Sequence, residues 1–149
     1  YQLKIDVRTE FENSKLDIGT IFIKNIDYKN SKGELGIFIG ENQARKKGLA
    51  KFVVSRILEV AFNDLKLQMM IYLPVIEDNI PAIKTYLKES FEIESKLRCD
   101  FLDKDINKDV LIMEILGQDW TKKHISPRGK ISNCMLVSSI CIDNGEQIA

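Results

Sequence analysis

Hydrophobic and polar positions near the start of the chain follow the two-residue period of β-strands. Residues 18–27 (IGTIFIKNID) and 34–40 (ELGIFIG) are rich in β-branched and aromatic residues, and the turn-forming residues YKNSKG lie between them. Such a pattern predicts two antiparallel strands joined as a hairpin. In the second strand alternate residues face opposite sides. One side carries Leu35, Ile37 and Ile39, and the other carries Glu34, Gly36 and Phe38.

From Leu49 the hydrophobic period changes from two to between three and four. The positions that recur with this period are Leu49, Phe52, Val53, Ile57, Val60 and Ala61, with charged residues between them. This spacing predicts a helix of about five turns with one face toward the core.

The second half of the chain continues with a strand, a helix and two strands. Residues 69–76 (MMIYLPVI) are continuously apolar, which predicts a strand covered on both faces. A short helix begins near Asn79, with Ile80, Ile83 and Leu87 as its core stripe, and strands follow at 92–102 and 108–116. The strand–helix–strand crossover requires a parallel pair, and hairpins flank it. The sequence therefore predicts an α/β protein with a mixed sheet.

The two ends of the chain are harder to interpret. Only 17 residues precede the first clear strand, and residues 117–149 form a tail in which a turn at 127–129 precedes one predicted strand, Ile131–Ile142. We expect a domain at 1–116 and a tail at 117–149. The tail packs on the domain, exchanges with a partner chain, or begins a second domain.

Composition and charge exclude several classes of protein. Lys plus Arg equals Asp plus Glu, 22 each in 149 residues, which disfavours nucleic acid as a partner. The chain lacks an apolar run of about 18 residues, so no membrane partner is expected and a cytoplasmic location follows by default. Cys99, Cys134 and Cys141 lack metal-ligand spacing and there is a single histidine, so we expect no metal.

The positive charge that is present concentrates in one turn. The candidate anion-binding residues at the start of the long helix are Arg45, Lys46, Lys47, Gly48, Leu49 and Ala50. Gly48 permits a close approach of the backbone, and the first N–H groups of a helix bind phosphate. Neither GxxxxGK[ST] nor GxGxxG is present, which disfavours the familiar nucleotide sites. The alternative is a solvated basic turn that binds nothing.

Two motifs resemble the GCN5-related N-acetyltransferases. The turn at 45–50 fits the R/Q-x-x-G-x-G/A signature of that family, and residues 73–91 (LPVIEDNIPAIKTYLKESF) resemble its L-x-V-x-x-x-N-x-x-A-i-x-x-Y-x-x-x-G-F segment. The strands at 18–27 and 109–116 resemble the branch that acetylates ribosomal-protein N-termini, spermidine and nucleotide-linked amino sugars. The resemblance covers about residues 18–116.

The resemblance implies acetyl-CoA as cosubstrate and direct attack by a primary amine in a ternary complex. In that case residues 45–50 bind the diphosphate, the backbone of Ile37, Phe38 and Ile39 bonds the pantetheine amides, and Asn79 and Ala82 line the cofactor. Tyr86 is the candidate general acid for the thiolate, and also a cofactor contact. Glu34 is the candidate base. The alternatives are a structural Tyr86 bonded to backbone and a solvated ion pair at Glu34.

Some features depart from the family pattern or test it. Ser90 replaces the usual glycine before Phe91. The strand and two helices that usually precede the hairpin are largely missing, so either the chain is a fragment, or a partner or the tail completes the acceptor pocket. Pro74 suits a strand that splays from its neighbour, because proline has no N–H to lose there.

The acceptor and the function class stay open. A nucleotide-linked amino sugar, a protein N-terminus (a peptide amine) and a polyamine are the acceptor classes, and a homodimer is an open option. Acidic residues that would suit a polyamine are Glu92, Glu94, Asp100, Asp103 and Asp105. The alternative functions are a non-catalytic acyl-CoA-binding or assembly module and an α/β protein that binds no cofactor.

Overall fold

The fold is a mixed α/β sheet, as the sequence predicts. A computed structural model describes residues 3–11, 14–40, 49–124, 140–142 and 146–148. The elements in chain order are β1 (Leu3–Phe11), β2 (Ser14–Asp27), β3 (Lys32–Ile39), α1 (Leu49–Glu59), the π-helix η1 (Val60–Asp64), β4 (Met70–Ile76), α2 (Ile80–Lys88), β5 (Glu92–Asp103), β6 (Ile106–Leu116), α3 (Gly117–His124), β7 (Ile140–Ile142) and β8 (Glu146–Ile148).

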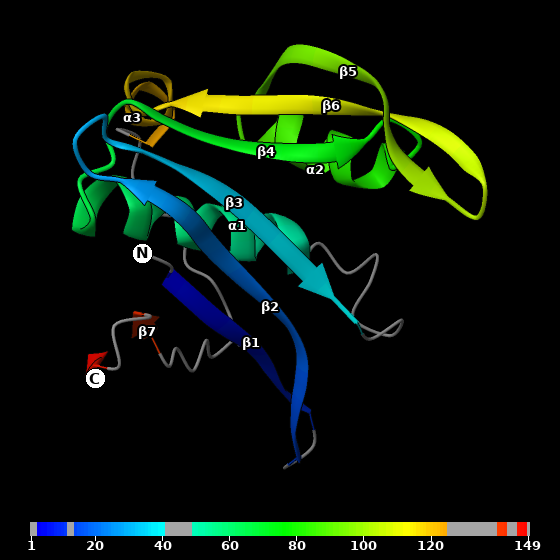
Figure 1. Cartoon of the computed structure of the whole chain (residues 1–149). Coiled ribbons are helices and arrows are strands. Elements are labelled where there is room, and N and C mark those ends of the chain that lie inside the picture. The colour runs from blue at the N-terminus through cyan, green and yellow to red at the C-terminus, as the bar shows by residue number, and fades with distance from the viewer. Residues whose placement is uncertain (1–2, 12–13, 41–48, 125–139, 143–145, 149) are drawn as a thin grey trace.

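These strands form one sheet in the order β5-β6-β4-β3-β2-β1-β7-β8. The β3–β4 pair is parallel and the other pairs are antiparallel, because α1 carries the chain from the end of β3 back to the start of β4. Figure 1 shows α1 crossing the sheet while β3 and β4 diverge from a shared end. Antiparallel hairpins therefore flank a parallel strand–helix–strand unit, which confirms the predicted arrangement.

The core lies between the sheet and the pair of contacting helices α1 and α2. Val53, Val54, Ile57 and Leu58 of α1 are buried at helical spacing, and Leu49 and Phe52 pack partly against them. The helix continues into η1, where Leu65 donates its N–H to the Val60 carbonyl at 2.9 Å. The predicted long helix is confirmed, with a wider last turn.

Two expectations about burial are wrong. The strand β4 is buried on one face only, because the alternate residues Ile71, Leu73 and Val75 face the helices and Pro74 is exposed. In α2 the predicted stripe fails, since Ile80 and Leu87 are about half exposed and Tyr86 is buried beside Ile83.

A strand also precedes the hairpin where we expected none. The residues LKIDVRTEF form β1 and pair antiparallel with β2. Their apolar and polar residues alternate with the two-residue period, so the signal was present in the sequence.

Parts of the tail join the same sheet and core. The Trp120 ring of α3 lies 5.3 Å from the Phe62 ring, centroid to centroid, and is buried. The short strand β7 pairs with β1, and β8 pairs with β7. Most of the predicted strand Ile131–Ile142 lies outside the described residues, and its end coincides with β7. The division at residue 116 stays a prediction.

Candidate functional site between β3 and β4

The gap between β3 and β4 begins where the parallel ladder ends. The two strands pair at Lys32↔Met70, Gly33↔Ile71 and Glu34↔Tyr72, and at no later position in the described strands. The ladder starts with Met70 N–H donating to the Ser31 carbonyl, and every second residue then faces the partner strand.

Pro74 occupies the position at which the next ladder bond would form. Continuing the alternation from Met70 places the N–H of residues 72 and 74 toward β3, and residue 74 is a proline without an N–H. On its other side β4 remains paired with β6 through Pro74↔Ile112. The strands are therefore splayed at Pro74, as predicted, and the proline loses no ladder bond.

The same alternation decides which backbone groups of β3 face the gap. The main-chain N–H and C=O groups of Leu35 and Ile37 face β4, whereas those of Gly36 and Phe38 face β2. The Glu34↔Tyr72 rung uses the Leu35 N–H, so the Leu35 carbonyl and both main-chain groups of Ile37 are the ones without a parallel rung to β4 in the register. This row has the geometry that an added extended chain can bond.

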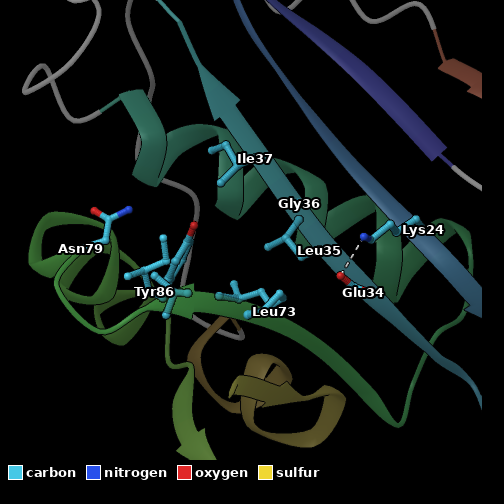
Figure 2. Close-up of a pocket in the computed structure, with 11 residues that line it drawn as sticks. Lys24, Glu34, Leu35, Gly36, Ile37, Leu73, Asn79 and Tyr86 are labelled. Atoms are coloured by element: carbon cyan, nitrogen blue, oxygen red, sulfur yellow. Dashed lines mark ion pairs between the residues drawn. The ribbon is translucent and has the colours of Figure 1, made fainter. Parts of the chain in front are cut away.

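A cleft of about 320 Å³ occupies this gap. Its lining residues come from β2, β3, β4 and the start and middle of α2, namely Lys24, Glu34, Leu35, Gly36, Ile37, Leu73, Pro74, Val75, Ile76, Asn79 and Tyr86. Figure 2 shows Asn79 and Tyr86 at one end and the Lys24–Glu34 pair at the other, with Leu35 and Leu73 between them. The structure thus brings the predicted residues Glu34, Ile37, Asn79 and Tyr86 to one cleft.

Tyr86 is the cleft residue whose ionisation differs most from its ordinary behaviour. Its side chain is buried, and its ring lies 5.7 Å from the Phe91 ring, centroid to centroid. Burial raises the pKa of Tyr86 to about 12, because a phenolate loses its hydration inside the protein. The phenol therefore keeps its proton at neutral pH and can donate it in a hydrogen bond.

Asn79 has a clear local role at the start of α2. It is the N-cap residue, and its Oδ1 accepts a hydrogen bond of 3.4 Å from the Ala82 N–H. Pro81 follows in the first turn, where its missing N–H costs nothing. The motif residues Asn79 and Ala82 thus fix where α2 begins, and so where Tyr86 stands.

Glu34 lies in a network of polar side chains at the far end of the cleft. Lys24 Nζ is 3.0 Å from Glu34 Oε1, and Asn25 Nδ2 donates to Oε2 at 2.9 Å. The Tyr72 hydroxyl is 3.5 Å from the same Oε2, and burial together with the Glu34 charge raises the pKa of Tyr72. Neither Lys24 nor Tyr72 was predicted from the sequence, although Lys24 is the direct cross-strand partner of Glu34 in the β2–β3 hairpin.

The predicted anion turn lies only partly within the described residues. Leu49 and Ala50 begin α1, whereas Arg45, Lys46, Lys47 and Gly48 lie outside the described residues. Lys51 follows in the first turn and lies 3.9 Å from the buried carboxylate of Glu89. The first turn of α1 contains no acidic residue, so no carboxylate there offsets the partial positive charge of the helix N-terminus. Ile39 and the exposed Phe38 end β3.

Ser90 keeps the turn that a glycine would make. Its φ is 71°, in the left-handed region, and Ser90 N donates to the Leu87 carbonyl at 3.1 Å. Phe91 N donates to the Tyr86 carbonyl at 3.0 Å and its ring is buried. The departure from the family pattern therefore changes the residue and leaves the αL backbone in place.

Comparisons with known proteins agree with this fold. Residues 1–92 match the family described as "Acetyltransferase (GNAT) domain". No curated protein shows a significant match to the sequence. Solved structures that match include a chimera of the Vibrio cholerae spermidine N-acetyltransferase SpeG and hSSAT, with 29% identity, a TM-score of 0.67, and coverage of 72% of this chain and 64% of that one.

Two further neighbours are from Vibrio cholerae. Spermidine N-acetyltransferase in complex with CoA and spermine has 29% identity, a TM-score of 0.70, and coverage of 77% of this chain and 66% of that one. The dodecameric structure of that enzyme in an intermediate state has 28% identity, a TM-score of 0.70, and coverage of 75% of this chain and 64% of that one. This chain spans less than two thirds of the length of each of the three structures. With the family matched over most of its length, the chain belongs to the GNAT acetyltransferase domain family.

Proposed function

We propose that this domain binds acetyl-CoA and transfers its acetyl group to a primary amine by direct attack. The observation that carries the proposal is the cleft opened at Pro74, with protonated Tyr86 in its wall and unpaired backbone positions of β3 along it. Pantetheine lies along β3 as an added strand, bonded by the main chain near Ile37. The family match and the CoA-bound neighbour support this cosubstrate.

The diphosphate of the cofactor binds at the N-terminus of α1. The residues proposed for this contact are Arg45, Lys46, Lys47, Gly48, Leu49 and Ala50. Main-chain N–H groups in the first helical turn have no partner within the helix, and the helix dipole favours an anion there. Ile39 stays a proposed backbone contact at the end of β3, whereas the main-chain groups of Phe38 face β2, so Phe38 is proposed to contact the cofactor through its exposed side chain.

Transfer needs a neutral amine and a stabilised leaving thiolate. Tyr86 donates a hydrogen bond, and finally a proton, to the sulfur. Glu34 takes the proton from the incoming amine, because it is the carboxylate among the residues that line the cleft. Asn79 and Ala82 position α2, and with it Tyr86, against the cofactor.

Among the acceptor classes we favour a polyamine. A row of directly paired residues crosses the sheet on the face that carries Glu34: Glu34↔Tyr72, Tyr72↔Glu114 and Glu114↔Glu92. Burial, with the charges of Glu94 and Glu92, raises the pKa of Glu114. Like charges opposite each other across two strands are destabilising, and a multivalent cation would relieve them.

One of the other acidic residues predicted for a polyamine is already engaged in an ion pair. Asp103 is 3.2 Å from Lys108 Nζ, so its charge is already compensated. The proposal therefore shifts from the β5–β6 turn to the row that leads into the cleft. The bound spermine of the Vibrio cholerae neighbour supports the same class.

A thiol-release assay with an amine panel tests the function. We expect acetyl-CoA to raise the melting temperature and spermidine to release free CoA faster than butylamine, a monoamine that matches the aminobutyl arm of spermidine. Turnover restricted to amino sugars or peptides would reject the polyamine, and the absence of any thermal shift would reject the cofactor.

The second candidate is a non-catalytic acyl-CoA-binding or assembly module. The observation that favours it is the engagement of Glu34 by Lys24 and Asn25, which leaves the proposed base occupied. A thermal shift without turnover of any amine would support this module. No helix in the described ranges has the length and apolarity to cross a bilayer. Cytoplasmic location and a homodimer stay predictions from the sequence.

A further inference from the structure

The amine of Lys24 lies beside the proposed catalytic carboxylate. Lys24 belongs to β2 and faces Glu34 of β3 directly across the hairpin, which leaves its Nζ 3.0 Å from Glu34 Oε1. Its side chain is 43% exposed and lines the same cleft as Tyr86. Among the described residues that line the cleft, Lys24 alone carries an amine.

This arrangement matches what the proposed reaction asks of an acceptor. An acceptor amine must lie within hydrogen-bond distance of the base and within reach of the thioester. Lys24 meets the first condition in the structure itself, and its four-carbon stem lets Nζ move along the cleft.

Resting on the proposed function, we propose that Lys24 is a self-acetylation site, modified by the acetyl-CoA bound to the same chain. Lys24 ammonium gives one proton to Glu34, and the neutral nitrogen attacks the acetyl carbonyl carbon. A C–N bond forms and the C–S bond breaks, with its electron pair leaving on sulfur. Tyr86 donates its proton to the thiolate, the second proton lost by the nitrogen restores the Tyr86 hydroxyl, and Glu34 returns its own proton to water.

The products are acetyl-Lys24, free CoA and one proton in solution, so no other reactant is needed. Acetylation removes the positive charge, and the Lys24–Glu34 ion pair is lost. Glu34 then keeps Asn25 and Tyr72 as neighbours. The carboxylate thereby becomes available to an external amine.

Lysines outside the cleft serve as controls for the acetylation of Lys24. Lys29 is exposed in the turn that joins β2 to β3, and it does not line the cleft. Lys96 is 2.8 Å from Glu77 and 2.9 Å from Asp109, on β5 away from the cleft. Chemical acetylation by the free thioester would modify Lys29 at least as readily as Lys24, because Lys29 is more exposed.

The test is incubation of the chain with acetyl-CoA alone, followed by peptide mass mapping over time. We expect Lys24 to acquire an acetyl group roughly tenfold faster than Lys29, since placement in the site raises its effective concentration. The fraction of Lys24 labelled per unit time should not change with protein concentration, because the reaction occurs within one chain. Tyr86→Phe should slow labelling of Lys24 and leave that of Lys29 unchanged, and Lys29→Arg should leave Lys24 labelling unchanged.

Equal labelling of Lys24 and Lys29, or a Lys24 rate that rises with protein concentration, would overturn the proposal. A parallel thermal-shift and spermidine-turnover assay separates the two levels of inference. Binding and turnover with Lys24 unmodified reject self-acetylation alone. Absence of both a thermal shift and turnover rejects the proposed function together with it.

Discussion

Replacing Tyr86 with phenylalanine tests the chemistry of the cleft most directly. The change removes one hydroxyl and keeps the ring, which is buried 5.7 Å from the Phe91 ring. Packing of α2 should therefore be preserved. We expect kcat to fall while KM for acetyl-CoA changes little, because the hydroxyl acts on sulfur that becomes negative only as the bond breaks.

The raised pKa of Tyr86 sets the size of the expected fall in kcat. A thiol ordinarily has a pKa of about 8.5, whereas Tyr86 has a pKa of about 12. Complete proton transfer from Tyr86 even to the fully formed thiolate would be uphill by about 3.5 units, or about 5 kcal/mol. Tyr86 therefore stabilises the transition state mainly by donating a hydrogen bond to a developing anion. Such a bond contributes about 1.5–3 kcal/mol, so kcat should fall roughly 10- to 150-fold.

The assay is CoA release at saturating amine, with acetyl-CoA varied, at neutral pH. Tyr28→Phe is the matched control, because Tyr28 is 49% exposed in the β2–β3 turn and outside the cleft. An unchanged kcat in Tyr86→Phe would remove Tyr86 from the mechanism. A loss of about 10⁴-fold would instead mean full general-acid catalysis, and the reasoning from its pKa would be refuted.

Further predictions concern stability and the open gap. Ser90→Gly should stabilise the fold by about 0.5–1 kcal/mol, because φ is 71° there; a lower melting temperature than that of Ser90→Ala would contradict this. Pro74→Val supplies an N–H opposite the Leu35 carbonyl, so the strands should close and acetyl-CoA should give a smaller thermal shift; an equal shift would exclude a role for the proline. Since burial raises the pKa of Tyr86 to about 12, stability should be full below about pH 10 and fall by about 2–3 kcal/mol as the pH rises toward 12. Tyr86→Phe should lack this loss in alkaline denaturation, and identical curves would oppose a buried phenol.

Local patterns in the sequence predicted most of the elements near the site. The two-residue period of β3 and the helical period of α1 each depend on one face being buried, and a single face is visible in a single segment. Asn79 is a helix N-cap by its residue type, and α2 begins directly after it. β1 carries the same alternation and was missed although its signal was present.

Local patterns could not predict burial where it depends on which side of an element a distant segment covers. The stripe Ile80, Ile83 and Leu87 is helical in spacing, yet only Ile83 is buried, because the position of α1 decides which side of α2 is covered. Likewise the apolar run of β4 does not reveal that one side of the strand faces a gap. The sequence could suggest that Pro74 has no ladder donor, but not which strand it would have met.

The sequence by itself determined the order of the elements, the hairpin that carries Glu34, and the motif residues Asn79 and Tyr86. Only the tertiary structure decided that these residues share one cleft, that Tyr86 is buried enough to keep its proton, and that Glu34 already has partners. The physical reason is that hydrogen-bond alternation and hydrophobic period act between near neighbours, whereas burial and electrostatic surroundings depend on segments distant in the chain.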